Sequence, residues 1–331
     1  MGFLLDTRER VKRVHEGSST EGRGQRGAPS VPPVRSLAGS AYAALPAYAE
    51  LHCLSNFTFL RGASRPEELV QHAHALGYKA IAITDECSVA GVVRAHVAAR
   101  ECRQADRKKE EEKHKGKDQP KKIEDEFKLI IGTEVKLADG PKLVLLATDR
   151  ASYGRMCALI TRGRMRTSKG EYRLEWTDFD EGLEGCLALL VPDARCDPEH
   201  AQRVAERFSN RAWIAVELVY GQNDAARLAA LRTLARQSGL PLVASGDVHM
   251  HLRSRRPLQD VMTAIRLGLT VETAGEALHP NAERRLRPRA HLGMIYPPEL
   301  IAETVCIANR CSFDLDTLRY EYPVSAMSSS G

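Results

Sequence analysis

The sequence lacks several features that define whole classes of protein. Its eight cysteines include no Cys-x-x-Cys pair, so neither a disulfide framework nor a structural zinc site is indicated, and reduced thiols in a cytoplasmic protein fit best. No apolar run approaches the roughly 20 residues that a membrane helix needs. The first residues contain no apolar core followed by a small-residue cleavage site, so we expect no secretory signal.

The chain also has little excess of either charge. Its 331 residues carry a formal net charge of +5 and give a pI of about 8.7. That imbalance is too small to argue by itself for a nucleic-acid partner. An apolar share of 43% is enough for a sizeable core, and the length suits one large domain or two smaller ones.

Two stretches are poor in residues that could join a core. Residues 1–44 are rich in Gly, Ser and Pro, which predicts a disordered tail. Residues 103–126 are nearly all charged, which predicts an insertion or a solvated extension of the preceding helix. Acidic residues balance the basic ones there, which argues against binding to nucleic acid. We therefore expect the main domain at 45–255, followed by a short, mostly helical segment at 256–331.

Between these stretches, short apolar runs mostly alternate with helical segments. We expect strands near residues 48–51, 80–84, 129–137, 143–147, 187–191, 213–219 and 241–245. Uninterrupted apolar runs are typical of parallel strands that are covered on both faces. Alternation of strand and helix with short connections implies right-handed crossovers. The pattern predicts an α/β fold with a parallel sheet or barrel.

Residues of the types that bind metals follow several of these strands. They are His52, Asp85, Glu86, Glu134, Asp247 and His249. The carboxyl ends of parallel strands meet at one rim of a barrel, which is where such folds build active sites. Imidazole and carboxylate groups together suit Zn²⁺, Mn²⁺ or Fe²⁺, and a cluster of such ions can activate water and bind a phosphate. The strand ends therefore predict a site of the phosphoesterase type.

A series of motifs occurs in order along the chain. They are YAELHCLSNFTFLRGAS (48–64), AITDECSVAGVV (82–93), IGTE (131–134), EGC (184–186), SGDVH (245–249), YPPEL (296–300) and LRYEYP (318–323). Together they resemble the PHP (polymerase and histidinol phosphatase) domain of bacterial C-family DNA polymerases. The residues within the motifs are most similar to those of the error-prone branch of that family. The resemblance covers residues 46–323 and implies a distorted parallel β/α barrel that binds several metal ions.

The resemblance also implies a set of ligand positions, of which this chain keeps only part. His52, Glu134, Asp247 and His249 stand at ligand positions, as does Cys186. We expect His52, Glu134, Asp247 and His249 to converge at one rim of the barrel.

Other positions depart from the family pattern. Leu54 stands in place of a histidine, Arg61 in place of an aspartate and Glu86 in place of a histidine, and Lys142 falls near a further histidine position. A leucine cannot bind a metal, and Arg and Lys repel a nearby cation, whereas Glu86 can still offer oxygen ligands. Because affinity depends on ligand number and geometry, we expect no certain cofactor and at most a residual divalent ion (Mn, Zn or Mg).

These departures favour a structural role for the barrel over catalysis. We hypothesise that the Arg and Lys side chains stabilise a metal-free cavity by pairing with Glu134 or Asp247. The resemblance implies that the catalytic carboxylates of the polymerase lie beyond this chain, which alone is not expected to extend a primer. We therefore interpret the chain as the N-terminal part of an error-prone, damage-tolerance DNA polymerase. Its partners would be DNA, dNTPs, the rest of the polymerase in cis, the sliding clamp and other damage-tolerance proteins. We expect no interaction with a membrane.

Two alternatives stay open. One is a free-standing metal-dependent phosphoesterase similar to histidinol phosphatase, against which Leu54, Arg61, Glu86 and the segment after residue 255 argue. The other is a non-enzymatic scaffold for polymerase partners. The basic stretch at 284–289 is expected to be a solvated loop in preference to a phosphate-binding one.

Overall fold

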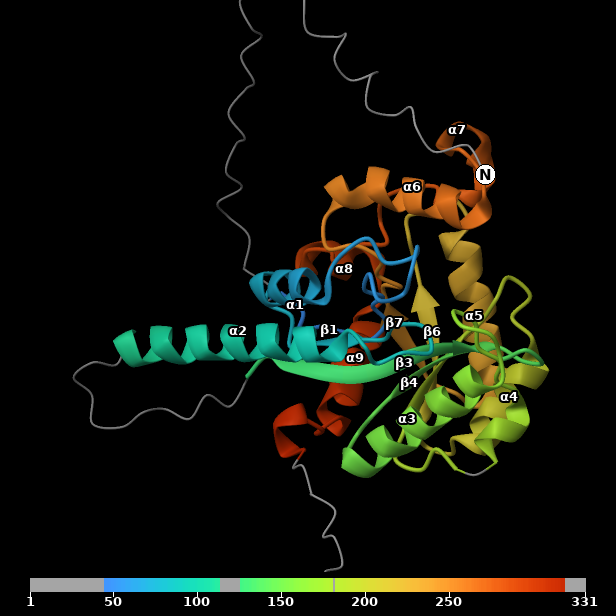
Figure 1. Cartoon of the computed structure of the whole chain (residues 1–331), viewed down its shortest axis with the longest axis horizontal. Helices are drawn as coiled ribbons and strands as arrows, with labels where there is room; N and C mark the ends of the chain where they lie inside the picture. Colours follow the sequence, from blue (N-terminus) through green and yellow to red (C-terminus); the bar gives the residue numbers. More distant parts are fainter. Residues whose placement is uncertain (1–44, 114–125, 181, 319–331) are drawn as a thin grey trace, which may run out of the picture. The chain divides into compact units, whose positions relative to one another are not determined.

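The strands of this protein form one sheet whose spatial order follows the chain. The computed structural model describes residues 45–113, 126–180 and 182–318, so the predicted tail at 1–44 lies outside the described residues. Within them, seven strands pair in the order β1 to β7 (Figure 1). Their bounds are β1 Ala49–Glu50, β2 Ala80–Ile83, β3 Lys128–Lys136, β4 Lys142–Leu146, β5 Leu187–Val191, β6 Ala212–Glu217 and β7 Leu242–Ser245.

The first and last strands of the sheet meet and nearly close it into a barrel. Cys53, which follows β1, forms a parallel bridge with Val248, which follows β7. The Leu54 amide donates to the Val248 carbonyl at 2.8 Å, and the Val248 amide donates to the His52 carbonyl at 2.9 Å. The predicted barrel of strands and helices is therefore confirmed.

One strand departs from the expected parallel arrangement. β4 runs antiparallel to both β3 and β5, whereas the other neighbouring strands pair in parallel. The reason is the connection between β3 and β4, because residues 137–141 are too few for the crossover that a parallel pair requires. An apolar run does not reveal its own direction, so the sequence pattern predicted the strand but not its orientation.

Helices follow the strands and cover the outside of the barrel. Their bounds are α1 Pro66–Ala75, α2 Val92–Lys113, α3 Arg150–Met165, α4 Pro198–Arg207 and α5 Asp224–Ser238. The Asp197 side chain caps α4 by accepting from the Glu199 amide at 2.9 Å, and Gly239 ends α5 with a φ of 74°. α2 continues through the first half of the charged stretch, as a solvated extension would, and residues 114–125 lie outside the described residues.

A last helix closes the barrel at the amino ends of its strands. α6 (Arg256–Leu267), α7 (Val271–Ala274) and α8 (Arg289–Ile295) precede α9 (Pro298–Arg310). Ile307 and Ala308 of α9 join the apolar core inside the barrel, and the Thr304 hydroxyl accepts from the Ala49 amide at 3.1 Å. The inner core thus contains residues from both sides of position 255. The domain boundary predicted at that position stays a prediction. No helix in the described part of the chain is long and apolar enough to cross a membrane.

Candidate functional site

At the carboxyl ends of the strands, one buried histidine contacts three acidic side chains. His52, which follows β1, approaches Glu134 of β3 with its Nε2 atom 2.7 Å from Oε2. Its Nδ1 atom lies 3.1 Å from Oε1 of Glu217, the last residue of β6, and its Nε2 atom lies 3.7 Å from Oδ1 of Asp247. The structure therefore brings together three of the expected residues and adds Glu217.

His249 lies beside this histidine and completes the group expected from the sequence. Its Nε2 atom lies 3.0 Å from Oδ1 of Asp247. Burial, followed by the charge of Arg61, lowers the pKa of His249 to about 3, so its imidazole is neutral at physiological pH. Asp247 has a φ of 41°, a left-handed conformation that persists where surrounding contacts fix it.

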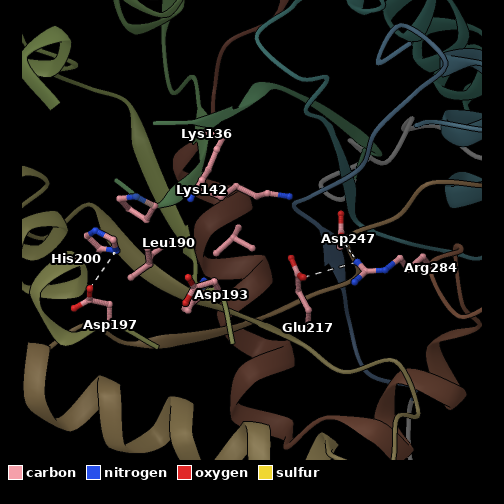
Figure 2. Close-up of a pocket in the computed structure, with 12 residues that line it drawn as sticks. Lys136, Lys142, Leu190, Asp193, Asp197, His200, Glu217, Asp247 and Arg284 are labelled. Carbon is pink, nitrogen blue, oxygen red and sulfur yellow. Dashed lines mark ion pairs between the residues drawn. The ribbon is translucent and has the colours of Figure 1, made fainter. Parts of the chain in front are cut away.

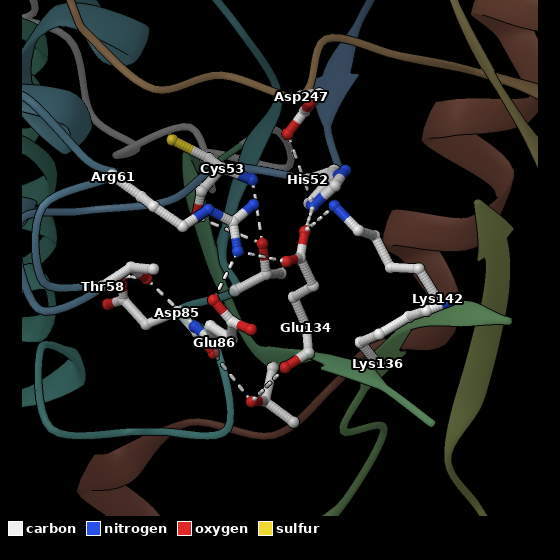
Figure 3. A network of polar contacts seen from close by, with 12 residues as sticks. His52, Cys53, Thr58, Arg61, Asp85, Glu86, Glu134, Lys136, Lys142 and Asp247 are labelled. Atoms are coloured by element: carbon white, nitrogen blue, oxygen red, sulfur yellow. Dashed lines mark hydrogen bonds and ion pairs between the residues drawn. The ribbon is translucent and has the colours of Figure 1, made fainter. Parts of the chain in front are cut away.

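Three cationic side chains enter the same site and bond to its acids, and two of them, Arg61 and Lys142, are drawn in Figure 3. Arg61 donates to Oε1 of Glu134 at 2.7 Å and also pairs with Glu86. Lys142 places its Nζ atom 3.2 Å from Oε2 of Glu134. Arg61, which stands where the family resemblance implies an aspartate, and Lys142, which falls near an implied histidine position, thus both contact Glu134.

The third cation is Arg284, which comes from the basic stretch after α6. It pairs with Asp247 and lies 3.9 Å from Oε2 of Glu217. We call the whole group the barrel-mouth cluster. Its members are His52, Arg61, Glu86, Glu134, Lys142, Glu217, Asp247 and Arg284.

The electrostatics of the cluster keep Glu134 and Glu217 ionised. Burial opposes ionisation of Glu134, but the hydrogen bond with His52 and the charges of Lys142 and Arg61 hold its pKa well below the usual range. Burial also opposes ionisation of Glu217, yet His52 and Arg284 lower its pKa to about 2. Burial disfavours the charged form of His52, while Glu134 and Glu217 raise its pKa.

The loop that carries Arg61 is held in place by Asp85. This buried carboxylate accepts from the Ser55 amide at 2.8 Å, from the Ser55 hydroxyl at 2.7 Å and from the Thr58 hydroxyl at 2.7 Å. Asp85 therefore shapes the loop and does not contact the cations of the barrel-mouth cluster. Glu86, the next residue, pairs with Arg61 and accepts from the Tyr172 hydroxyl at 3.0 Å.

Two other positions named from the family pattern contribute no ligand to the barrel-mouth cluster. Leu54 is fully buried, and its side chain offers no ligand atom. Cys186 is not brought to the cluster, and this corrects its assignment as a ligand. It immediately precedes β5, so it lies at the amino end of that strand, and its Sγ contacts the Ser152 carbonyl at 3.4 Å. Burial raises the pKa of its thiol to about 12, which disfavours the thiolate that binds metals.

The residues fit an ion-pair network better than a metal site. Ligand atoms of His52, Glu134 and Asp247 lie within 4.8 Å of one another, a spacing that could hold an ion. Each of these atoms already has a protein partner, however: Glu134 Oε2 contacts both His52 and Lys142, and Asp247 Oδ1 contacts His249. The four carboxylates of the cluster face three permanent cations and a histidine, so a divalent ion would have to displace existing bonds.

A cavity of about 350 Å³ opens beside the cluster (Figure 2). Glu217, Asp247, Arg284 and Lys142 form one side of it, and Asp193 lies on the β5 side. The lining contains both acidic and basic side chains. The cavity therefore offers neither a uniformly positive surface for a phosphate nor a uniformly negative one for a bare cation.

The sequence analysis missed Glu217 and Arg284. Glu217 could have been found, because it ends an apolar strand as Glu134 does. Arg284 could not, since it belongs to the stretch expected to be a solvated loop. That expectation was wrong for Arg287 too, which is 1% exposed and donates to the Leu218 carbonyl at 2.8 Å and to the Tyr296 hydroxyl at 3.1 Å.

Comparison with known proteins identifies the family of this chain. The profile of the PHP domain matches residues 50–231, more than half of the chain. An error-prone DNA polymerase of Azoarcus sp. (strain BH72) is 53% identical over 288 residues, which cover 85% of this chain and 27% of that protein. The error-prone DNA polymerase of Dechloromonas aromatica is 52% identical over 284 residues, with 84% and 25% covered. The chain thus spans about a quarter of the length of the curated relatives it matches.

Among solved structures, a candidate metal-dependent phosphoesterase from Bifidobacterium adolescentis is similar with a TM-score of 0.41. It is 14% identical, and the match covers 62% of this chain and 89% of that one. Taken together, the barrel, the ordered motifs and the profile match show that this chain belongs to the PHP domain family.

Proposed function

We propose that this chain is the PHP-domain part of an error-prone DNA polymerase, and that its barrel site is a metal-free structural element. Relatives that carry that name match most of the chain with 52% to 53% sequence identity. The observation that supports the structural role is the pairing of Glu134 with Arg61 and Lys142, which puts fixed charges at or near positions where the family resemblance implies metal ligands.

On this proposal, the partners belong to the whole polymerase. DNA and dNTPs would be its substrates, the rest of the polymerase would pack against the barrel in cis, and the sliding clamp and other damage-tolerance proteins would be its further partners. Such a protein would work in the cytoplasm. The barrel would contribute rigidity, because a fully paired polar network fixes the strand ends in one arrangement.

A metal-dependent phosphoesterase is the second candidate function. The spacing of His52, Glu134 and Asp247 favours it, since three such groups are the minimum for a catalytic zinc or manganese site. The cations bonded to the same carboxylates argue against it. The cavity beside the cluster also lacks the single-sign lining expected for a phosphate monoester.

The two functions can be separated with two proteins. The first is a chimera in which this chain replaces the matching region of the Azoarcus polymerase, and we expect it to extend a primer with Mg²⁺. The second is the chain alone, which we expect not to hydrolyse p-nitrophenyl phosphate with added Mn²⁺. Turnover that is abolished by His249→Ala and kept by His74→Ala, a change on α1 away from the site, would overturn the proposal.

A further inference from the structure

Helix α6 presents its apolar side to solvent and its polar side to the protein. Gln259 and Thr263 are 2% and 4% exposed, whereas Val261 and Ile265 are 43% and 58% exposed. Leu258, Val261 and Ile265 are spaced by three and four residues, so they lie on one face of the helix, opposite the buried residues. A surface helix of a complete domain normally has the reverse arrangement.

The apolar face extends beyond the helix. Leu267, Leu269 and Val271 follow it and are 42%, 44% and 38% exposed. We call Leu258, Val261, Ile265, Leu267, Leu269 and Val271 the α6 surface. In Figure 1, α6 and α7 lie together at the edge of the described part of the chain. Contiguous exposed apolar side chains of this kind mark an interaction site.

Charge and area indicate what covers the α6 surface. Arg266 is exposed beside Ile265 and makes no ion pair among the described residues, whereas the exposed Arg253, before α6, is already paired with Glu283. A second copy is disfavoured by area, because a stable interface needs about 800 Å² from each partner, more than one three-turn helix face supplies.

We propose that the α6 surface is the face on which the remaining part of the polymerase docks in cis, through an apolar patch with an acidic residue opposite Arg266. This inference rests on the proposed function, under which relatives about three times as long must pack the rest of their chain against this domain. It adds the location of that contact, which lies on α6 and not at the barrel-mouth cluster.

The test compares cysteine accessibility in the chain alone and in the Azoarcus chimera. Ile265→Cys is the probe, and Val97→Cys on α2, which is 50% exposed in the parent, is the matched control. Maleimide labelling is mapped by mass spectrometry, so other cysteines do not interfere. We expect both positions to react in the chain alone, and Ile265→Cys to react about tenfold or more slowly in the chimera while Val97→Cys is unchanged.

Other outcomes would overturn the proposal. Equal labelling at position 265 in both proteins means that the polymerase part does not cover α6. Protection in the chain alone means that a second copy covers it if the chain is dimeric, or residues 1–44 if it is monomeric.

A second pair of changes guards against misfolding. Leu258→Glu with Ile265→Glu should leave the melting temperature of the chain alone unchanged and lower primer extension by the chimera. Unchanged extension would also overturn the proposal. Primer extension by the parent chimera tests the proposed function separately, because labelling is read whether or not the chimera is active.

Discussion

Replacement of Arg61 by methionine should destabilise this protein much more than loss of an ordinary surface arginine. Methionine keeps most of the aliphatic length of the side chain but removes the charge. Arg61 is bonded to Glu134, whose side chain is 1% exposed, at 2.7 Å, and Arg61 itself is 19% exposed. The change therefore leaves a buried carboxylate without its closest permanent cation.

The expected loss follows from what remains around Glu134. Removal of one partner from a buried ion pair costs about 3 to 5 kcal/mol. Lys142 at 3.2 Å and His52 at 2.7 Å still compensate Glu134, so we expect a loss near the lower limit, about 3 kcal/mol. For a domain of this size, that corresponds to a fall in the melting temperature of about 6 to 12 °C.

The assay is urea and thermal unfolding followed by circular dichroism, with Arg232→Ala as control. Arg232 is 50% exposed and lies 3.8 Å from Glu299 on the surface, so its loss should cost under about 1 kcal/mol. A loss in Arg61→Met no larger than that of the control would refute the reasoning.

A double-variant cycle isolates the interaction itself. Glu134→Gln removes the buried charge and leaves Arg61 paired with Glu86. If the Arg61–Glu134 contact stabilises the fold, the double variant should be more stable than the sum of the single losses predicts, by about 1 to 3 kcal/mol. Strict additivity would show that the two side chains do not interact.

The remaining predictions concern pH, a buried arginine and metal binding. The pKa of Glu217 is about 2, below its ordinary 4.5, so its stabilising contribution is present above pH 4.5 and is lost as the pH falls toward 2. Glu217→Gln should therefore reduce the decline in unfolding free energy over that window by about 1 to 3 kcal/mol; an unchanged decline would exclude this role. Arg287→Lys should cost about 2 kcal/mol or more in urea unfolding, because lysine cannot bridge the Leu218 carbonyl and the Tyr296 hydroxyl; a loss near zero would contradict this. Restoring the ligand types of the family should create Mn²⁺-dependent stabilisation of about 2 to 4 kcal/mol at saturating metal, measured by thermal shift, and no response would count against the charge-replacement account. The changes are Leu54→His, Arg61→Asp, Glu86→His and Lys142→His.

Much of the barrel could be predicted because strand position and strand end are local properties of the sequence. The apolar runs placed the strands within a few residues, and the residue after each run placed His52, Glu134 and Asp247 at one rim. The direction of β4 could not be predicted in the same way. It depends on the connection of five residues from β3, and the apolar composition of the strand is compatible with either direction.

The contents of the site were only partly predictable, because they depend on contacts between distant segments. Cys186 was assigned from its motif, yet it lies at the start of β5 and not at its end. Arg284 and Arg287 belong to one basic stretch that looks solvated, but both bind partners from distant segments, Asp247 for the first and the Leu218 carbonyl for the second. The sequence contains no local signal for such pairing.

The metal content of the purified chain tests the central claim most directly. The chain would be expressed with added Mn²⁺ and Zn²⁺, purified without chelator and analysed by inductively coupled plasma mass spectrometry. If fixed cations have replaced metal ions, we expect less than about 0.1 equivalents of either metal and no change in melting temperature with EDTA. Near-stoichiometric Mn or Zn, whose removal lowers the melting temperature, would contradict the account.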